Sequence, residues 1–146
     1  MIQQTLVLLK PDAIERALVG RIIERFEQAG LAIEAIRLTR PDRELLRRHY
    51  ADLEPRNPAA FVKNTNYLAG KPIIAMVLSG VQAIQKVRAL IGPTEPASAP
   101  PGTIRGDFSC DTIRHADSLD RGLFNLAHAS DSDEAVRREI EVWFPK

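Results

Sequence analysis

Hydrophobic residues along the chain form either short continuous runs or runs spaced like one face of a helix. Residues 5–9 and 72–78 are continuous apolar runs ended by breakers, which is typical of buried strands. Residues 31–39 alternate with a period of two, which predicts a strand with one wetter face. Residues 123–127 are the last short apolar run. The pattern therefore predicts four strands, with Lys10 at the end of the first.

Helical spacing of apolar residues recurs between the predicted strands. The segments that have it are residues 19–29, 42–50, 81–91 and 130–144. Gly30 follows the first of them, where a left-handed C-terminal cap belongs. Asp42 is an N-cap candidate, and the last helical segment begins with overlapping capping-box patterns, Asp131 to Glu134 among them. Residues 55–71 mix breakers with a weak helical pattern around Phe61, so their structure is left open.

Strand and helix alternate four times, and this order predicts the fold class. We expect an α+β fold, a ferredoxin-like sandwich in which a four-stranded antiparallel sheet carries the helices on one face. The length of 146 residues fits one domain over residues 1–146. Residues 93–107 form a loop dense in proline, and residues 108–122 an irregular excursion. Loops of this length are usually functional or disordered.

Composition and charge exclude several classes of protein. The chain is 45% hydrophobic and 27% charged, as globular domains are. Its net charge of +1 gives no global attraction to nucleic acid or anionic lipid, so anion binding must come from local clusters. Cys110 is the only cysteine, which excludes a disulfide framework and a thiolate zinc site. The apolar run before Lys10 is too short for a secretory or membrane segment, so we expect a cytoplasmic protein.

Candidate phosphate ligands must be side chains, because the sequence has neither a P-loop nor a G-x-G-x-x-G motif. Four candidates lie next to breaks in regular structure: Lys10, Arg88, Thr94 and Arg105. A guanidinium forks onto phosphate oxygens, and an ammonium adds a point charge. Any single cation is more often an ordinary surface residue, so only their convergence would indicate a site.

His128 is the most informative of the three histidines. It lies between the apolar pair 126–127 and the polar run 130–132, at the end of a predicted strand and facing a helix start. A neutral imidazole can attack phosphorus, and the helix amides can bind an anion. An isolated histidine is as often structural. His49 and His115 lack such a setting, and we expect them on the surface or in loops.

Glu139 lies at the edge of the apolar stripe of the last helix, beside Trp143. The simpler interpretation is that its carboxylate reaches solvent. The alternative is that Glu139 pairs with His128 and orients the imidazole as the third group of a nucleophile site.

Four segments of the chain resemble the nucleoside diphosphate kinase family, and the likeness covers most of the chain. They are LLKPDAIERALVGRIIERFEQAG, VRALIGPTEP, PPGTIRGDF and NLAHASDSDEAVRREIEVWF. The last segment, with N-x-x-H followed by a small residue and S-D-S, is the most specific. The resemblance implies transfer of the terminal phosphoryl group of a nucleoside triphosphate to a nucleoside diphosphate, by a ping-pong mechanism through a phosphohistidine.

The resemblance also implies roles for particular residues. His128 would be the phosphorylated nucleophile, held by Ser130 and Glu139. Nucleotide or phosphate contacts would come from Lys10, Tyr50, Arg88, Thr94, Arg105 and Asn125. The implied cofactor is Mg²⁺, carried by the nucleotide phosphates and not by a metal site of the protein. The implied partners are nucleoside di- and triphosphates and further copies of the chain, with a hexamer favoured over a tetramer or dimer, and no membrane or specific nucleic acid.

Three positions depart from the family pattern. Between Arg105 and Asn125 the chain carries about ten extra residues, which predicts an inserted loop at about 109–122. The family's Pro-Phe-Phe is replaced by residues 58–61, Pro-Ala-Ala-Phe, so the aromatic ring that stacks on the base is Phe61 or is absent. Alanine stands where glycine usually follows the histidine, a change that backbone with negative φ accepts.

Two other classes of function compete with this one. A non-catalytic nucleotide-binding or partner-binding relative could have the same fold. Against it, the polar residues of the implied site are all present: Lys10, Arg88, Arg105, His128 and Glu139. A nucleic-acid-binding protein has only one basic cluster for support, Arg43, Arg47 and Arg48, which a solvated helix face explains more simply.

Overall fold

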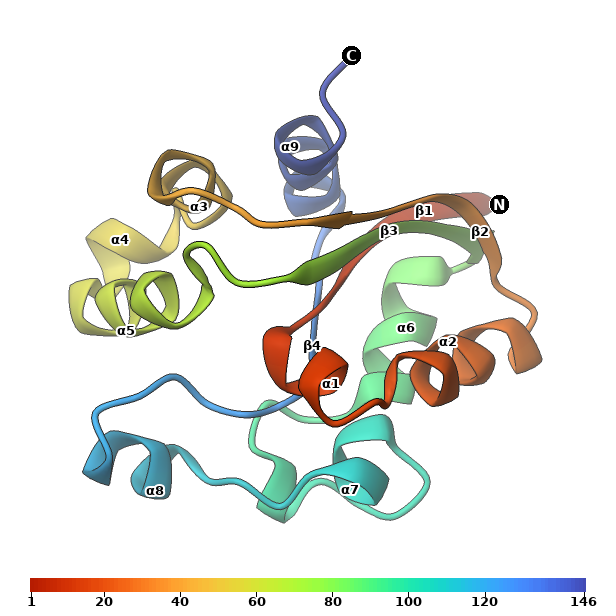
Figure 1. Cartoon of the computed structure of the whole chain (residues 1–146). Coiled ribbons are helices and arrows are strands. Elements are labelled where there is room, and N and C mark those ends of the chain that lie inside the picture. The colour runs from red at the N-terminus through yellow and green to blue at the C-terminus, as the bar shows by residue number, and fades with distance from the viewer.

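The computed structural model describes residues 1–146, and its centre is one four-stranded antiparallel sheet (Figure 1). The strands are β1 (Ile2–Leu9), β2 (Ala32–Thr39), β3 (Ile73–Val81) and β4 (Ala127–Ala129). Their order in the sheet is β2-β3-β1-β4, and each neighbouring pair is antiparallel. The predicted α+β architecture is confirmed.

Strand β1 is buried on both faces, as its continuous apolar run predicts. Leu6 and Leu8 belong to the core on one side of the sheet, and Val7 and Leu9 to the core on the other side. Burial of each such side chain contributes about 1.5–3 kcal/mol. A strand of this kind needs cover on both faces.

Helices cover both faces of the sheet, so the prediction that they lie on one face was wrong (Figure 1). The helices of one face are α2 (Val19–Gln28) and α6 (Ala83–Ile91), and those of the other are α3 (Arg43–His49), α5 (Pro58–Leu68) and α9 (Asp133–Trp143). Phe26 and Val87 bring α2 and α6 onto the first core, whereas Leu46, Leu68 and Trp143 bring the other three onto the second. Helices cover both faces because the continuous apolar run of β1 leaves no face of the sheet suited to solvent.

Side-chain caps set the starts of the main helices. Asp42 accepts a hydrogen bond from Leu45 N at 2.8 Å, which confirms it as the N-cap of α3 and is worth about 1 kcal/mol. Helix α9 is capped by Ser132, which accepts from Ala135 N at 3.1 Å, so the pattern from Asp131 to Glu134, one of the overlapping predicted patterns, is not the cap. Gly30 has φ 86°, the left-handed conformation expected of it.

Several short helices were not predicted. They are α1 (Pro11–Glu15), α4 (Leu53–Arg56), the 3₁₀ turn η1 (Pro96–Ser98), α7 (Ile104–Phe108) and α8 (Ile113–Ser118). Residues 55–71, left open by the sequence, contain the end of α4 and all of α5. Helix α8 lies within residues 109–122, the predicted insertion, and is seen below α5 at the lower left of Figure 1. No helix has the length and apolar character needed to cross a bilayer.

The fourth strand was predicted at residues 123–127 but is found at Ala127–Ala129. Side chains form hydrogen bonds with the backbone groups that would pair with a neighbouring strand. Leu123 O accepts from Lys10, Phe124 N donates to Asp111, and Leu126 N donates to Asp12. Leu126 also has φ 73°, which no regular strand allows. His128 therefore lies inside β4, paired with Leu8, and not beyond its end.

Candidate active site

One cavity of about 520 Å³ brings together most of the polar residues singled out in the sequence. The predicted residues among its lining are Lys10, Tyr50, Arg88, Thr94, Arg105, Asn125 and His128. Its size is that of a small-molecule site. The lining carries three basic side chains, Lys10, Arg88 and Arg105, and a single carboxylate, Asp131, so the cavity favours a polyanion.

Lys10 enters the cavity from the end of β1. Its Nζ donates to Leu123 O at 2.7 Å and to Asn125 Oδ1 at 2.8 Å, so no carboxylate neutralises the ammonium directly. Burial lowers the pKa of Lys10 to about 8, with Asp12 opposing this and Arg105 adding to it. The ammonium is thus largely protonated at neutral pH, and its third N–H is left for a ligand.

Arg105 comes from α7 and is almost fully buried. Its guanidinium donates to Asn125 O at 3.0 Å, Gly92 O at 3.0 Å and Ala127 O at 2.5 Å. Burial, and then the nearby Arg88, lower the pKa of Arg105 to about 10, so it remains charged at neutral pH. Three of its five N–H groups hold the backbone on either side of the cavity, and two remain for phosphate oxygens.

Asn125, Thr94 and Arg88 complete this wall. The Asn125 amide donates to Thr94 O at 3.0 Å while its oxygen accepts from Lys10, so one buried side chain connects two parts of the cavity. Arg88 Nη1 donates to Ala129 O at 3.4 Å. The side chains of Arg88 and Thr94 are exposed, which leaves both accessible to a ligand in the cavity.

His128 is held by Glu139. The imidazole Nε2 is hydrogen-bonded to Glu139 Oε1, and the glutamate is only 2% exposed, so its carboxylate does not reach solvent. The histidine side chain is 31% exposed and borders the cavity. Because Glu139 occupies Nε2, Nδ1 is the ring nitrogen that is left for chemistry.

His49 is buried behind His128, so the expectation that it lies on the surface or in a loop was wrong. Trp143 Nε1 donates to His49 Nδ1 at 3.1 Å, and the two imidazole centroids are 4.6 Å apart, edge to face. Burial, followed by His128 and Arg138, keeps the pKa of His49 well below its usual value. His49 is therefore neutral and makes no ion pair with Glu139, although 3.6 Å separates their atoms. One signal in the sequence indicated this burial: His49 follows Leu46 by three residues, which places both on the same face of the helix.

The three side chains of His49, His128 and Glu139 could each offer a metal ion one ligand atom, all within 4.8 Å. Two imidazoles and a carboxylate suit zinc better than magnesium. The Trp143 hydrogen bond to His49 and the contact between His128 and Glu139 already engage these groups. We interpret the cluster as support for the His128 ring. His115, by contrast, lies exposed on α8, as expected.

Two predicted site residues lie elsewhere than expected. Ser130 is fully buried, its N–H donates to Leu6 O at 3.1 Å, and its hydroxyl has no hydrogen-bond partner, so it makes no hydrogen bond to His128. Phe61 is 9% exposed and does not line the cavity. Its ring lies edge-on to Tyr50, with centroids 6.5 Å apart. The structure thus brings neither side chain into the cavity.

Asp12 is a supporting residue that was not among the predicted site residues. It is 5% exposed; Oδ2 accepts from Leu126 N at 3.0 Å, and Oδ1 accepts from the Tyr67 hydroxyl at 3.0 Å. These bonds hold Leu126 in its left-handed conformation just before β4. Nothing in the sequence pattern distinguishes this buried aspartate from an ordinary helix-start residue, because its partners are distant along the chain.

The fold and the cavity define an α+β protein that binds phosphorylated ligands, with a glutamate-backed histidine on an edge strand. Comparison with known proteins identifies its family. The family model described as nucleoside diphosphate kinase matches residues 3–146. The chain is 44% identical over 142 residues to nucleoside diphosphate kinase 3 of Homo sapiens, covering 97% of this chain and 77% of that protein. It is 44% identical over 146 residues to the nucleoside diphosphate kinase of Mycobacterium tuberculosis, covering 99% and 98%.

Solved structures agree. A transition-state mimic of a Borrelia burgdorferi nucleoside diphosphate kinase with bound vanadate and ADP matches with a TM-score of 0.95 at 36% identity, covering 99% of this chain and 88% of that one. A Halobacterium salinarum nucleoside diphosphate kinase in complex with CDP matches with a TM-score of 0.85 at 35% identity, covering 100% and 90%. The chain belongs to the nucleoside diphosphate kinase family. It is an enzyme that moves the γ-phosphoryl group of a nucleoside triphosphate to a nucleoside diphosphate, and the non-catalytic alternative is not supported.

Proposed function

We propose that the enzyme works by a ping-pong mechanism in which His128 carries the phosphoryl group. The observation that carries this proposal is the fixed imidazole: buried Glu139 holds Nε2 while the ring borders a cavity rich in cations. A histidine positioned by a third group is a suitable nucleophile. Phosphoryl transfer otherwise requires in-line placement and charge neutralisation, which such a cavity supplies.

In the first half-reaction the triphosphate lies along Lys10, Arg88 and Arg105. Nδ1 of His128 attacks the γ-phosphorus; the N–P bond forms as the bond to the β-γ bridging oxygen breaks, and the nucleoside diphosphate leaves with that electron pair. Glu139 accepts the hydrogen bond from Nε2–H and stabilises the positive charge that develops on the imidazole. In the second half-reaction a diphosphate oxygen attacks the same phosphorus and the N–P bond breaks.

The remaining cavity residues would bind the nucleotide. Tyr50, Thr94 and Asn125 lie along the cavity beside the cations and can contact ribose or phosphate oxygens. Burial, and then Glu139, raise the pKa of Tyr50, so its phenol stays protonated and can donate. Relatives have been solved with ADP and with CDP, a purine and a pyrimidine nucleotide. This supports broad tolerance of the base.

Magnesium fits the site as a companion of the nucleotide. The only carboxylate that lines the cavity is Asp131, whereas Mg²⁺ prefers several oxygen ligands and commonly takes them from phosphates. We therefore expect the phosphate oxygens to hold the ion. Asp131 is the one negatively charged side chain of the cavity that could add a protein ligand. When bound, the ion supplies neutralisation of the phosphate charge.

We also propose a cytoplasmic, oligomeric enzyme, with a hexamer favoured over a tetramer or dimer. The single cysteine, Cys110, is exposed and unpaired, which suits a reducing compartment. Strand β2 is a sheet edge that exposes apolar side chains, Ile36 at 50% and Leu38 at 66%. Such an edge is normally covered, here by another copy of the chain.

Labelling with γ-³²P ATP tests the mechanism. The purified enzyme is expected to take up one acid-labile, base-stable phosphate per chain and to lose it when any nucleoside diphosphate is added. His128→Gln should take up none, whereas His115→Gln, a change of the exposed histidine on α8, should label like the wild type. Full label on His128→Gln would refute the assignment of the nucleophile.

A further inference from the structure

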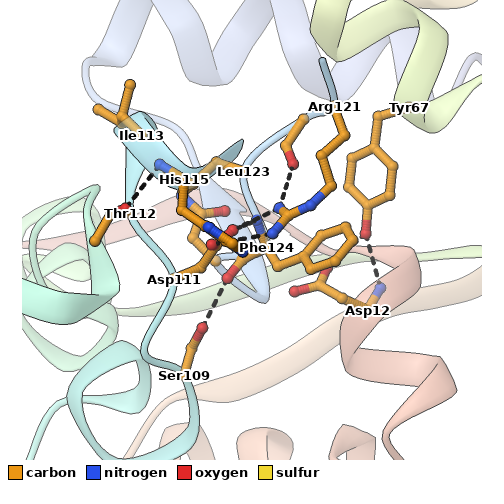
Figure 2. A network of polar contacts seen from close by, with 12 residues as sticks. Asp12, Tyr67, Ser109, Asp111, Thr112, Ile113, His115, Arg121, Leu123 and Phe124 are labelled. Carbon is orange, nitrogen blue, oxygen red and sulfur yellow. Dashed lines mark hydrogen bonds and ion pairs between the residues drawn. The ribbon is translucent and has the colours of Figure 1, made fainter. Parts of the chain in front are cut away.

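The inserted segment, residues 109–122, is hydrogen-bonded to Phe124 through Asp111 and Ser109 (Figure 2). The neighbouring Leu123 accepts a hydrogen bond from Lys10, on the phosphate-binding side of the cavity. We propose that the ion pair between Asp111 and Arg121 in this segment is a positioning device for Lys10. The role rests on the proposed function, in which the Lys10 ammonium binds the triphosphate.

The ion pair is forked and largely removed from solvent. Arg121 Nη1 donates to Asp111 Oδ2 at 2.7 Å and Nη2 donates to Oδ1 at 3.1 Å, with the side chains 22% and 8% exposed. The guanidinium also lies over the Phe124 ring, 3.8 Å from its centroid. Burial raises the pKa of Asp111, but hydrogen bonds from Arg121 and from the backbone outweigh this and hold it below its usual value. A bidentate pair of this kind fixes geometry in a way that a single exposed contact does not.

The pair fixes the backbone of three consecutive residues, 122 to 124. Arg121 Nη1 donates to Gly122 O at 3.0 Å, and Phe124 N donates to Asp111 Oδ2 at 2.9 Å. Ser109, at the start of the insertion, donates from its hydroxyl to Phe124 O at 2.7 Å. Phe124 N and the Leu123 carbonyl belong to one peptide unit, so Asp111 holds the plane of that carbonyl, and the peptide units on either side of it are held through Gly122 O and Phe124 O. These contacts appear in Figure 2 around Asp111 and Phe124.

The Leu123 carbonyl is one of the two groups that place the ammonium. It accepts from Lys10 Nζ at 2.7 Å, and Asn125 Oδ1, two residues further along, accepts at 2.8 Å. Residues 123–126 belong to no strand, so no sheet ladder fixes this carbonyl. The ion pair between Asp111 and Arg121 fixes the carbonyl instead. A displacement of the Leu123 carbonyl would therefore displace Lys10 Nζ, the nitrogen that binds phosphate.

The insertion is also hydrogen-bonded to the loop that follows Thr94. Ala97 N donates to Asp111 O at 3.1 Å, and Ile113 N donates to Glu95 Oε1 at 2.9 Å, in the residue next to Thr94. The same segment thus connects the Thr94 loop with the Lys10 acceptors. It is part of the cavity's framework and not a surface appendage.

A second ion pair of the insertion provides a matched control. Asp117 on α8 pairs with Lys63 of α5 at 2.7 Å, with side chains 54% and 30% exposed. The hydrogen bond between Lys63 and Asp117 is the only side-chain hydrogen bond that either residue makes, so neither is bonded to residues 122–125. An aspartate change there removes an ion pair from the same segment without touching the Lys10 acceptors.

The test compares Asp111→Ala and Asp111→Asn with Asp117→Ala and Asp117→Asn in the full-length enzyme. Two quantities are measured: the single-turnover rate of His128 phosphorylation by ATP, and the rate at which trace acetic anhydride modifies Lys10, read by mass spectrometry. The second needs no catalysis. Because a displacement of about 1 Å in an active site can cost roughly 100-fold, we expect Asp111→Ala to slow phosphorylation roughly 10-fold to 100-fold. Asp111→Asn, which keeps an oxygen for Phe124 N, should be intermediate.

Lys10 should also be modified several-fold faster in both Asp111 variants, because its acceptors no longer hold it. The Asp117 variants should match the wild type in both measurements. Folded Asp111 variants with wild-type Lys10 reactivity would overturn the positioning role, even if their rates were lower. A wild type that takes up no phosphate would refute the proposed function, and the Lys10 reactivities would still decide whether the ion pair places the ammonium. Melting temperatures identify variants that fail to fold. If Asp111→Ala fails to fold, Asp111→Asn is the milder substitution.

Discussion

At the scale of single residues, the contact between His128 and buried Glu139 is the one on which the chemistry depends. Glu139→Gln keeps the shape and a hydrogen bond but loses the charge that stabilises the imidazolium. We expect the rate of His128 phosphorylation to fall about 10-fold to 100-fold, or about 1.4–2.7 kcal/mol of barrier, with the melting temperature nearly unchanged. Single-turnover kinetics measure this. Glu141→Gln, an exposed change on the same helix, is the control. Equal rates at equal stability would mean that Glu139 has no part in the chemistry.

Lys10 makes the activity sensitive to alkaline pH. Its pKa is about 8 in the folded enzyme, lowered by burial, so the ammonium needed for triphosphate binding is lost as the pH rises through that value. We expect kcat/KM for the triphosphate to decline above pH about 8. Stability changes in the opposite direction to activity. The pKa of Lys10 is lower in the folded protein than the value of 10.5 in the unfolded chain, so Lys10 loses its proton first in the folded state. Its contribution to the free energy of unfolding therefore increases as the pH rises from about 8 to 10.5.

A pH profile of Lys10→Arg separates this effect from other titrations. A guanidinium stays protonated through the range, so the decline near pH 8 should disappear in this variant even if its overall activity is lower. An alkaline limb that persists unchanged in Lys10→Arg would show that another group causes it.

At the scale of elements, the sequence predicted what local pattern controls and missed what distant side chains control. The apolar run of β1 and the Asp42 cap of α3 were readable, because neighbours along the chain decide them. The segment before β4 was not, because Asp12 and Asp111 supply its hydrogen bonds from far along the sequence. Its apolar composition resembles a strand, yet its backbone groups are already bonded to side chains.

The candidate site divides in the same way. Residues next to breaks in regular structure, such as Lys10 and Thr94, were found because the chain must bend there, and the structure brings both to the cavity. His49 was missed because its setting depends on Trp143 and His128, which the sequence places far away. The burial of Phe61 could not be predicted either, since its face of α5 packs against Tyr50, which follows the end of α3.

Phe61→Ala distinguishes a core role from a base-stacking role. Because Phe61 is 9% exposed and lies against Tyr50, we expect the free energy of unfolding to fall by about 3–5 kcal/mol. Nucleotide affinity should change by less than the about 1–3 kcal/mol of a lost base stack. Denaturant unfolding and equilibrium binding of ADP measure the two effects, and Val62→Ala on the exposed face of α5 is the control. Lost affinity at unchanged stability would restore Phe61 to the nucleotide site.

At the scale of the whole molecule, the exposed edge strand β2 predicts self-association. Ile36 and Leu38 stand two residues apart and therefore point to the same side of the strand. Leu38→Lys should place a charge in the contact between copies and lower the mass measured by analytical ultracentrifugation. Leu119→Lys, at an exposed site in the insertion, should leave it unchanged. A wild-type enzyme that sediments as a monomer at micromolar concentration would contradict the expected oligomer.

The central claim is that the phosphorylated His128 lies on the catalytic pathway, and rapid-quench kinetics test it most directly. Enzyme is phosphorylated with γ-³²P ATP, freed of nucleotide and mixed with a nucleoside diphosphate, and the formation and loss of label are timed separately. We expect both steps to be at least as fast as steady-state turnover, with all label passing to the new triphosphate. A phosphoenzyme that forms or discharges more slowly than kcat would be a side product, and the mechanism proposed for this cavity would be wrong.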